Sequence, residues 1–181
     1  GPTIMRFGTE KQKAHFLPKI LAGELLVAIG YSEPNAGTDL ASLTTRAERD
    51  GDDWGINGQK TWTSLADHSD YIWLAARTDP NSKKHRGISI FLVPTTARGF
   101  SLQPIWTLGG VRTNATFYEN VRLPASALVG PENGGWGLIT NQLNHERVSL
   151  LVAAPLEAIY DEVLRHTRET KRADGSRHDD A

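Results

Sequence analysis

Between about residues 24 and 130 the chain is a succession of short strand-like segments separated by turn residues. Segments 70–77 and 87–94 are apolar at nearly every position, as expected of strands that are covered on both faces. Asp50-Gly51 and Asn57-Gly58 are dipeptides typical of tight hairpin turns. So many short strands predict a small β-barrel or sandwich rather than a doubly wound α/β sheet. The expected strands are 25–32, 43–49, 52–57, 60–63, 70–77, 87–94, 99–105 and 115–122.

A short helix is predicted ahead of the strands, over residues 9–22. Thr9 is suited to cap its start, and Gln12 stands three residues later, which is the spacing of a capping box. Gly23 follows as a terminator that can adopt a left-handed conformation. Pro18 lies inside the segment, where it could kink or divide the helix.

A much longer helix is predicted after the strands. From Trp136 to Leu164 apolar residues recur at helical spacing, which indicates one helix over about 135–170, with Pro155 as a site for a kink. At 1.5 Å per residue this helix would be roughly 50 Å long. Its apolar stripe requires helical partners that the rest of the chain does not offer. We therefore expect helices of another domain or subunit to be missing and the chain to be an incomplete record.

The composition excludes several classes of function. The 181 residues are 39% hydrophobic and 23% charged, which is typical of one globular domain or slightly more. A net charge of −1 with interspersed charges gives no electrostatic footprint for nucleic acid. Without cysteine there are no disulfides, thiolate nucleophiles or Cys-based metal sites, and the six histidines lack metal-ligand spacing. No run is long enough for a membrane span and no signal peptide is recognisable, so we expect a cytoplasmic protein.

Residues 31–39 form the first segment that could bind a ligand. Pro34 fixes φ and Gly37 tolerates a positive φ, so the backbone must turn here. Such a loop could present free N–H groups, with the hydroxyls of Ser32 and Thr38, to an anionic or heteroaromatic ligand. The same composition also fits a plain polar connection between two strands.

A second candidate follows the predicted hairpins. In Trp62-Thr63-Ser64 a flat indole could lie against a flat ligand, with the two hydroxyls at the ligand's edge. Trp62 could equally cap the core of the barrel.

The third candidate is Asn144-His145-Glu146-Arg147 in the long predicted helix. Glu146 and Arg147 are adjacent and point about 100° apart, so they need not pair with each other. A charged pair in such a helix is either solvated surface or, among the surrounding apolar residues, part of a half-buried site.

Taken in order, these segments resemble the signature motifs of the acyl-CoA dehydrogenase family. Residues 31–39 are similar to the family's E-P-x-A-G-[ST]-D signature, and 57–64 match N-G-x-K-x-[WY]-[IT]-[ST]. Further similarities stand at 86–89, 110–113, 121–124 and 143–147. The matches run in order from about residue 8 to 165. The general character of the sequence is also similar to that of actinobacterial members of the family.

The resemblance implies a fold with three parts. Residues 1–23 would end an N-terminal helical domain, 24–131 would form the middle β-barrel, and 132–181 would begin a C-terminal helical domain. The chain would thus be mainly β, with a small barrel flanked by a short helix and a long one. FAD would bind between the barrel and the C-terminal bundle, and a neighbouring subunit would complete the site. We therefore expect a homodimer, a homotetramer or a hetero-tetramer.

The resemblance also assigns the three candidate segments to a reaction. It implies α,β-dehydrogenation of an acyl-CoA, in which a carboxylate removes the α proton and electrons pass to an electron-transferring flavoprotein. Most members carry this base in a part of the C-terminal bundle that is absent here, whereas a minority have it at the position of Glu146. A non-catalytic subunit of a hetero-oligomer remains the alternative. Implied FAD contacts are Ile29, Tyr31, Ser32, Thr38, Trp62, Thr63 and Ser64, and implied contacts with the CoA part are Thr38, Asn144 and Arg147.

Overall fold

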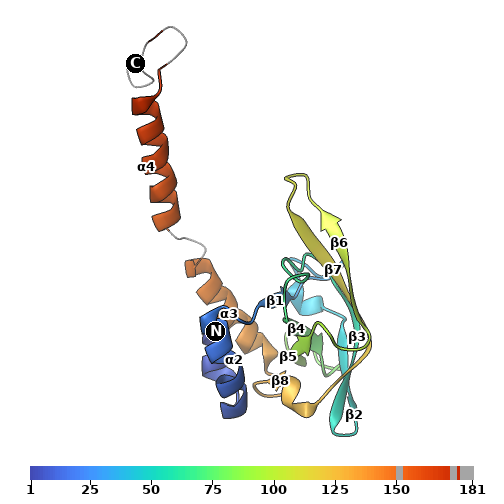
Figure 1. Ribbon diagram of the computed structural model, residues 1–181. Coiled ribbons are helices and arrows are strands. Elements are labelled where there is room, and N and C mark those ends of the chain that lie inside the picture. The colour runs from blue at the N-terminus through green and yellow to red at the C-terminus, as the bar shows by residue number, and fades with distance from the viewer. Residues whose placement is uncertain (150–152, 172–174, 176–181) are drawn as a thin grey trace. The chain divides into compact units, whose positions relative to one another are not determined.

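The structure is a computed structural model that describes residues 1–149, 153–171 and 175. The chain divides into two compact units, residues 1–142 and 143–181. The first unit contains every strand among the described residues, and the second contains the end of α3 and all of α4 (Figure 1). Across the described ranges, no helix combines the length and apolar character needed to cross a lipid bilayer.

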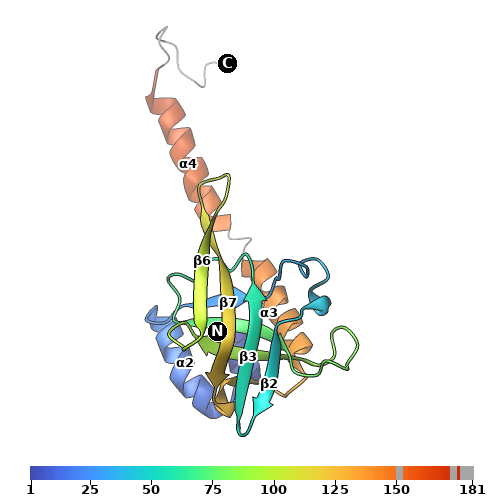
Figure 2. The ribbon, with the colours of Figure 1, turned by 90° about the vertical axis from the view of Figure 1, so that its right-hand side faces the viewer.

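The strands of the first unit belong to one sheet, ordered β6-β7-β3-β2-β4-β5-β8, with β1 beside β4 (Figures 1 and 2). β1 and β4 are parallel, whereas β2–β3, β3–β7, β4–β5, β5–β8 and β6–β7 are antiparallel. The strands are β1 (Val27–Gly30), β2 (Arg46–Asp50), β3 (Asp53–Lys60), β4 (Tyr71–Arg77), β5 (Ile88–Pro94), β6 (Phe100–Trp106), β7 (Arg112–Leu123) and β8 (Leu128–Val129).

The prediction of a mainly β chain with helices at both ends is confirmed, but the sheet is not closed into a barrel. In the described part of the chain, β6 and β8 end the path of pairing. β2 meets β4 at a single parallel pair, Arg46 and Arg77, so the sheet consists of two groups of strands, β6-β7-β3-β2 and β4-β5-β8 with β1, joined at a narrow seam. Such a seam lets the two groups turn toward each other without requiring the outer strands to pair.

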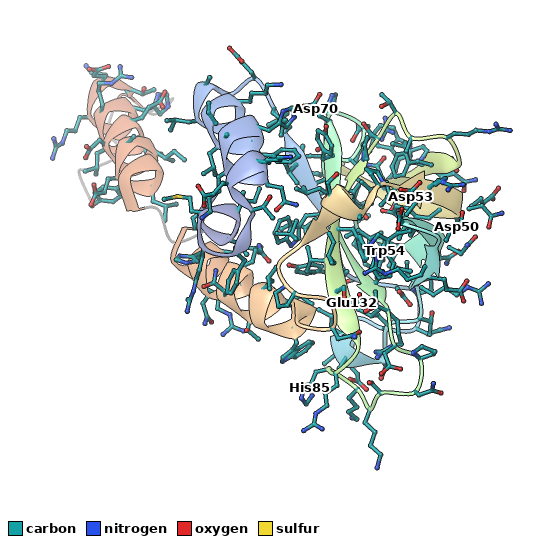
Figure 3. All side chains as sticks on the ribbon, turned by 90° about the horizontal axis from the view of Figure 1, so that it is seen from below. Asp50, Asp53, Trp54, Asp70, His85 and Glu132 are labelled. Carbon is teal, nitrogen blue, oxygen red and sulfur yellow. The ribbon has the colours of Figure 1, made fainter. Side chains whose placement is uncertain are left out.

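The main core lies between these two groups of strands. Trp54 and Ile56 of β3, Leu74 of β4 and Phe91 of β5 belong to one buried cluster, and Figure 3 shows Trp54 within the strand layers. The rings of Trp54 and Phe91 meet edge-on at 5.2 Å. On β4 and β5 both faces are buried, as the continuous apolar runs predicted.

The predicted N-terminal helix is confirmed together with its capping box. A short helix α1 (Pro2–Phe7) precedes α2 (Glu10–Ala22), and Pro18 is accommodated within α2. Thr9 Oγ1 accepts from Gln12 N at 3.2 Å, while Gln12 Oε1 accepts from Thr9 N at 2.9 Å. The Nε2 of the same Gln12 donates to the carbonyl oxygens of Ser126 and Leu128, each at 2.9 Å. One side chain therefore both caps α2 and fastens it to the segment around β8.

One hairpin prediction is confirmed and the other is wrong. Asp50 and Asp53 pair across a two-residue turn between β2 and β3, and both carboxylates bind Arg122, at 3.2 and 2.8 Å (Figure 3 labels the two acids). Asn57-Gly58 instead lies inside β3, at a shift in register against β7. Gly58 has φ of 146°, and a Cβ on it would lie 2.6 Å from Thr45 Oγ1. The glycine is therefore needed for a bulge and a close approach, not for a turn.

The bulge lets β3 continue to Lys60, so the separate strand expected at 60–63 is wrong. The chain leaves the sheet at Thr61, and 61–70 contain no strand. The short strand β8 was not predicted. Two single-turn 3-10 helices, η1 (Leu40–Ser42) and η2 (Ala125–Ala127), complete the connections.

The apolar helical pattern after residue 135 appears as two helices, α3 (Gly135–Ser149) and α4 (Ala153–Glu169). The predicted continuity over 150–152 lies outside the described residues. Pro155 stands in the first turn of α4, where its missing N–H removes no helical hydrogen bond. Along α4 the side chains of the predicted stripe are exposed: Leu156, Ile159, Tyr160 and Val163.

The hairpin of β6 and β7 extends beyond the other strands and ends in the segment 107–111 (Figures 1 and 2). The turn is closed by Thr107, whose N–H and Oγ1 both donate to the carbonyl of Val111, at 3.1 and 2.8 Å. Trp106, Leu108 and Val111 are exposed at this end.

Replacing Gly58 by Ala should destabilise the protein by ~1–3 kcal/mol, because the new Cβ meets Thr45 backbone and side-chain atoms at an unfavourable φ. Gly55→Ala in the same strand is the matched control, since its Cβ would have no neighbour nearer than 3.9 Å. Urea unfolding of the two variants measures the difference. Equal stability of both variants would contradict the role assigned to Gly58.

Candidate functional site

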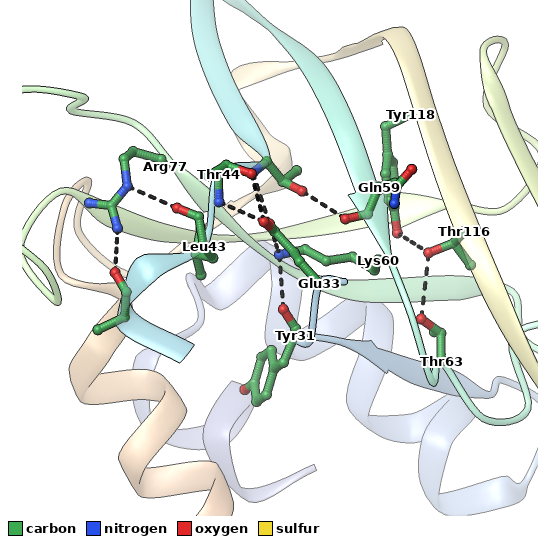
Figure 4. A network of polar contacts seen from close by, with 12 residues as sticks. Tyr31, Glu33, Leu43, Thr44, Gln59, Lys60, Thr63, Arg77, Thr116 and Tyr118 are labelled. Atoms are coloured by element: carbon green, nitrogen blue, oxygen red, sulfur yellow. Dashed lines mark hydrogen bonds and ion pairs between the residues drawn. The ribbon is translucent and has the colours of Figure 1, made fainter. Parts of the chain in front are cut away.

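The structure brings the loop at 31–39 and the segment at 60–64 together. Thr61 N donates to the carbonyl oxygen of Ser32 at 2.8 Å, and Lys60 Nζ donates to the carbonyl oxygen of Tyr31 at 3.0 Å. Figure 4 shows the second of these contacts, with a dashed line from the Lys60 ammonium to the Tyr31 carbonyl. Two motifs that are about 30 residues apart in sequence therefore form one surface region, which we call the paired loops (residues 31–39 and 60–64).

A buried ion pair lies beneath the paired loops. Lys60 Nζ is 2.9 Å from Glu33 Oε1, and the two side chains are 0% and 5% exposed. Glu33 Oε1 also accepts from Thr45 N at 2.8 Å, while Oε2 accepts from Thr44 N at 2.7 Å and from Thr44 Oγ1 at 2.8 Å (Figure 4). Both carboxylate oxygens are thus hydrogen-bonded, which is the condition for burying a charge at acceptable cost.

This environment shifts the pKa of both partners. Burial raises the pKa of Glu33, but the Lys60 charge, its hydrogen bond and the N–H groups of Thr44 and Thr45 outweigh burial and lower that pKa to about 2. Burial lowers the pKa of Lys60 to about 8, against the attraction of Glu33. Glu33 is therefore charged throughout the physiological range, and its partner is mostly charged at neutral pH.

Two of the backbone N–H groups in the loop at 31–39 form hydrogen bonds within the loop. Glu33 N donates to the Ala36 carbonyl at 2.9 Å, and Ala36 N donates back to the Glu33 carbonyl at 3.1 Å. Thr38 is exposed and Ser32 is half-buried. The hydroxyl-bearing positions therefore remain at the surface, whereas the N–H groups of Glu33 and Ala36 hold the turn.

Trp62 is held at the surface in a strained conformation. Its side chain is 59% exposed and its φ is 60°, which costs a bulky residue ~1–3 kcal/mol. The alternative that Trp62 caps the core is therefore wrong. Thr63, by contrast, is fully buried, and its Oγ1 lies 3.5 Å from Thr116 Oγ1, which in turn is 3.2 Å from the hydroxyl of Tyr118. The segment places the indole outward and the next side chain inward.

A polar cluster centred on Asn114 fixes the backbone of Thr63, the residue that follows Trp62. Thr63 N donates to the Asn114 carbonyl at 2.9 Å, and Asn114 Nδ2 donates to the Thr63 carbonyl at 3.2 Å. Asn114 Nδ2 also donates to Asp67 Oδ1 at 2.9 Å, and Arg112 donates to Asn114 Oδ1 from Nε and Nη2 at 3.1 and 3.0 Å. The hydrogen bond from Asn114, with Arg112 and His68 nearby, lowers the pKa of Asp67. Asn114 is the centre of this cluster.

Arg77 holds the backbone that follows the first loop. Its guanidinium donates to the carbonyl oxygens of Ala41 at 2.7 Å and Leu43 at 3.2 Å (Figure 4). It also donates to the carbonyls of Lys84 and Arg86, each at 3.0 Å. One side chain on β4 therefore joins the segment around η1 to the loop between β4 and β5.

The other predicted site residues are placed as follows. Ile29 lies half-buried on β1 opposite Trp73. Tyr31 is 7% exposed, and its hydroxyl accepts from Trp73 Nε1 at 2.9 Å. Ser64 is exposed, and its Oγ is 3.2 Å from Thr113 Oγ1. These residues belong to the first unit, with the paired loops.

The predicted residues of the long helix belong to the second unit. Asn144 and Arg147 are exposed and Glu146 is half-buried, all three on α3. The structure brings together the first two candidate segments, whereas the third stands in a separate unit.

Sequence reasoning missed the residues that hold the site. Glu33, Lys60 and Asn114 contribute most of the fixed contacts, and none was singled out as a functional residue. A signal was present for two of them, since Glu33 is one of two acids in the first motif and Lys60 is the one charged residue of the second. Their pairing, however, spans 27 positions and is set by how the strands associate.

Comparison with known proteins identifies the class. The family described as "Acyl-CoA dehydrogenase, middle domain" matches residues 28–121, which contain the paired loops. The chain therefore belongs to the acyl-CoA dehydrogenase family.

Individual relatives are similar to this chain over almost its whole length, beyond the residues that the family model matches. It is 57% identical over 180 residues to acyl-CoA dehydrogenase FadE26 of Mycobacterium tuberculosis, a match that covers 98% of this chain and 45% of the relative. The crystal structure of the ChsE4-ChsE5 complex from Mycobacterium tuberculosis is similar with a TM-score of 0.87 and 57% identity, over 99% of this chain and 47% of that one. A variant of the Tcur3481-Tcur3483 steroid acyl-CoA dehydrogenase gives a TM-score of 0.88 and 55% identity, over 93% and 45%. The chain spans less than half the length of these relatives.

Replacing Glu33 by Gln should remove about 3 kcal/mol of stability at neutral pH, the equivalent of the lowered pKa of Glu33. Because the folded state lowers that pKa below its value in the unfolded chain, this stabilisation is complete above pH 4.5 and is lost as pH falls toward 2. The gap between wild type and variant should therefore close on acidification. Urea unfolding at several pH values between 3 and 7 measures it.

The matched control is Glu24→Gln, which exchanges an exposed carboxylate and should leave the acid profile unchanged. A gap between wild type and Glu33→Gln that stays constant from pH 7 to pH 3 would contradict the assignment.

Proposed function

We propose that this chain is the part of an FAD-dependent acyl-CoA dehydrogenase that holds the flavin and the acyl-CoA thioester. The observation that carries the proposal is Trp62, an exposed indole kept in a strained backbone conformation by contacts on both sides. Strain of this kind persists where the surrounding structure enforces it, and it concentrates at ligand sites.

The residues of the paired loops fit a flavin chemically. A flavin ring is flat, partly apolar and bordered by hydrogen-bonding atoms, and Trp62 offers an exposed flat face. Ser32 and Ser64 carry hydroxyls on the two paired loops, and these residues are half-buried and exposed respectively. When bound, FAD supplies the acceptor for the hydride that leaves the substrate's β carbon.

Individual roles follow from these positions. Trp62 and Ser64 would contact the ring system directly, whereas Thr63 would act through its fixed backbone, since its side chain is buried. Tyr31 and Ile29 would support the loop from beneath, and Tyr31 does so through its bonds to Trp73 and Lys60. Together with Ser32 and Thr38, these complete the proposed flavin contacts.

Thr38, Asn144 and Arg147 are the proposed contacts with the CoA part. Support comes from the surface next to the loop, where a cavity of about 460 Å³ is lined by Thr44, Arg46, Lys84 and Glu48, among others. The lining includes three cations, Arg46, Arg77 and Lys84, against one carboxylate, Glu48, and this excess of positive charge suits the phosphates of CoA.

The chemical step requires a base for the α proton, and Glu146 is our candidate within this chain. It is half-buried on α3, where a carboxylate is partly shielded from water. Hydrogen bonds to the thioester carbonyl would stabilise the enolate-like transition state. The proposal further includes an electron-transferring flavoprotein as electron acceptor, a cytoplasmic location, and a division into parts at 1–23, 24–131 and 132–181.

A second candidate function is that of a non-catalytic partner subunit of a hetero-oligomeric acyl-CoA dehydrogenase. It is favoured by the relatives whose names describe two-component assemblies, the ChsE4-ChsE5 complex and Tcur3481-Tcur3483. By the same similarity we propose an acyl group of the steroid or fatty-acyl class as substrate.

The full-length protein should contain FAD and show an oxidised-flavin spectrum that fades when a suitable acyl-CoA is added. Acyl-CoAs of graded size, including steroid side-chain thioesters, would define the substrate. Trp62→Ala should weaken FAD binding about tenfold, since it removes a stacked aromatic face worth ~1.4 kcal/mol. Fluorescence titration of the flavin-free protein with FAD measures this.

Trp106→Ala is the matched control, because Trp106 is also exposed but lies at the end of the β6–β7 hairpin. A colourless wild-type protein that cannot be loaded with FAD would overturn the proposed function. Equal FAD affinity of Trp62→Ala and Trp106→Ala would remove Trp62 from the site.

Glu146→Gln in the full-length protein should keep its FAD but lose the decrease in flavin absorption on addition of acyl-CoA, since the amide cannot accept the α proton. Stopped-flow absorption measures the rate, with Glu157→Gln on α4 as an exposed control. Reduction at the wild-type rate would show that Glu146 is not the base and would favour a base elsewhere.

A further inference from the structure

We propose that Glu33 and Lys60 form a positioning pair, which holds the two paired loops in the geometry that the flavin requires. The inference rests on the proposed function and assigns a role to two residues that would not themselves touch the ligand. Its basis is where the pair lies, what it binds and which strained residue depends on it.

The pair connects the two loops at the positions next to the proposed contacts. Glu33 directly follows Ser32, and Lys60 is separated from Trp62 by one residue. Lys60 Nζ binds both the Tyr31 carbonyl, at 3.0 Å, and Glu33 Oε1, at 2.9 Å. One ammonium group therefore fixes the backbone before Ser32 and the side chain after it.

Glu33 extends the connection to a third segment. Its carboxylate accepts the N–H groups of both Thr44 and Thr45 and the hydroxyl of Thr44. Thr45 Oγ1 donates in turn to the carbonyl of Gln59, at 3.1 Å, directly before Lys60. The bonds form a closed circuit around the end of β3, in which each segment constrains the next (Figure 4).

The strained Trp62 needs such a constraint on both sides. On its C-terminal side Thr63 is fixed to Asn114, and the Asp67–Arg112 pair holds Asn114 in place. On its N-terminal side the fixed contact is Thr61 N to the Ser32 carbonyl. The position of Ser32 depends on the Glu33–Lys60 pair, so the pair provides the second support for the indole.

The pair's chemistry suits positioning better than bulk stabilisation. Well-packed apolar side chains commonly replace a buried ion pair without loss of stability. They cannot reproduce directed bonds to the Tyr31 carbonyl and to the N–H groups of Thr44 and Thr45. Compared with such an apolar replacement, what the two charges add here is fixed geometry.

The test compares Lys60→Met, Glu33→Gln and the double variant in the full-length protein. The double variant leaves no buried charge unpaired, so it should fold even where a single variant is impaired. Val93→Ala is the matched control, since Val93 is a fully buried core residue of β5 outside the circuit. Urea unfolding establishes the stability of each variant.

Two readouts separate positioning from general stability, and neither uses turnover. Hydrogen exchange of the flavin-free protein, followed by mass spectrometry, should become about tenfold faster in segments 40–46 and 59–63 of the double variant, but not in β4 and β5. FAD affinity, measured by titration, should fall about tenfold in the double variant and remain unchanged in Val93→Ala.

The outcomes are distinct. A wild-type protein that binds no FAD overturns the proposed function. A wild type that binds FAD, together with a double variant of equal affinity and unchanged local exchange, overturns the positioning role alone. Faster exchange throughout the sheet, matched by Val93→Ala, would show that the pair serves only stability and would also overturn it.

Discussion

Two opposite charges withdrawn from water, Glu33 and Lys60, connect the two paired loops beneath the candidate site. Burying either charge alone would be costly, so each one requires the other and requires hydrogen bonds on its remaining atoms. Glu33 obtains them from the backbone N–H groups of Thr44 and Thr45, and Lys60 from the carbonyl of Tyr31. Satisfying two side chains thus brings three separate stretches of backbone to the end of β3. The proposed site is a consequence of that electrostatic requirement.

The sequence predicted the elements whose causes are local. The capping box of Thr9 and Gln12 spans three residues, so its geometry follows from helix chemistry alone. The strands at 70–77 and 87–94 were recognisable because both of their faces are apolar. Asn57-Gly58 misled because the same dipeptide serves a hairpin turn and a bulge, and here the close approach of Thr45 decides between them. The open sheet was not predictable either, since closure depends on pairing between strands distant in sequence.

The candidate site also divides into features that the sequence reveals locally and contacts that depend on distant parts of the chain. The order of the motifs identified the family and the segments around Ser32, Trp62 and Glu146. A motif specifies residue types and their order along the chain, but it does not specify their positions in space. The structure added what no local pattern contains: Trp62 is exposed and strained, Thr63 faces inward, and Asn114 from a distant strand fixes the backbone between them. Contacts of this kind depend on register between β3 and β7, which is a property of the folded sheet.

The amide of Gln12 has a consequence for how such chains can be divided. It caps α2 from within the helix and also binds two carbonyls more than 110 residues further along. A cut at residue 23, where composition suggests a natural border, would therefore separate a donor from both of its acceptors. A relative's helix joined at that point would need its own side-chain donor at position 12 to reach those carbonyls. The two parts are thus poor candidates for exchange as independent modules, although their sequences look separable.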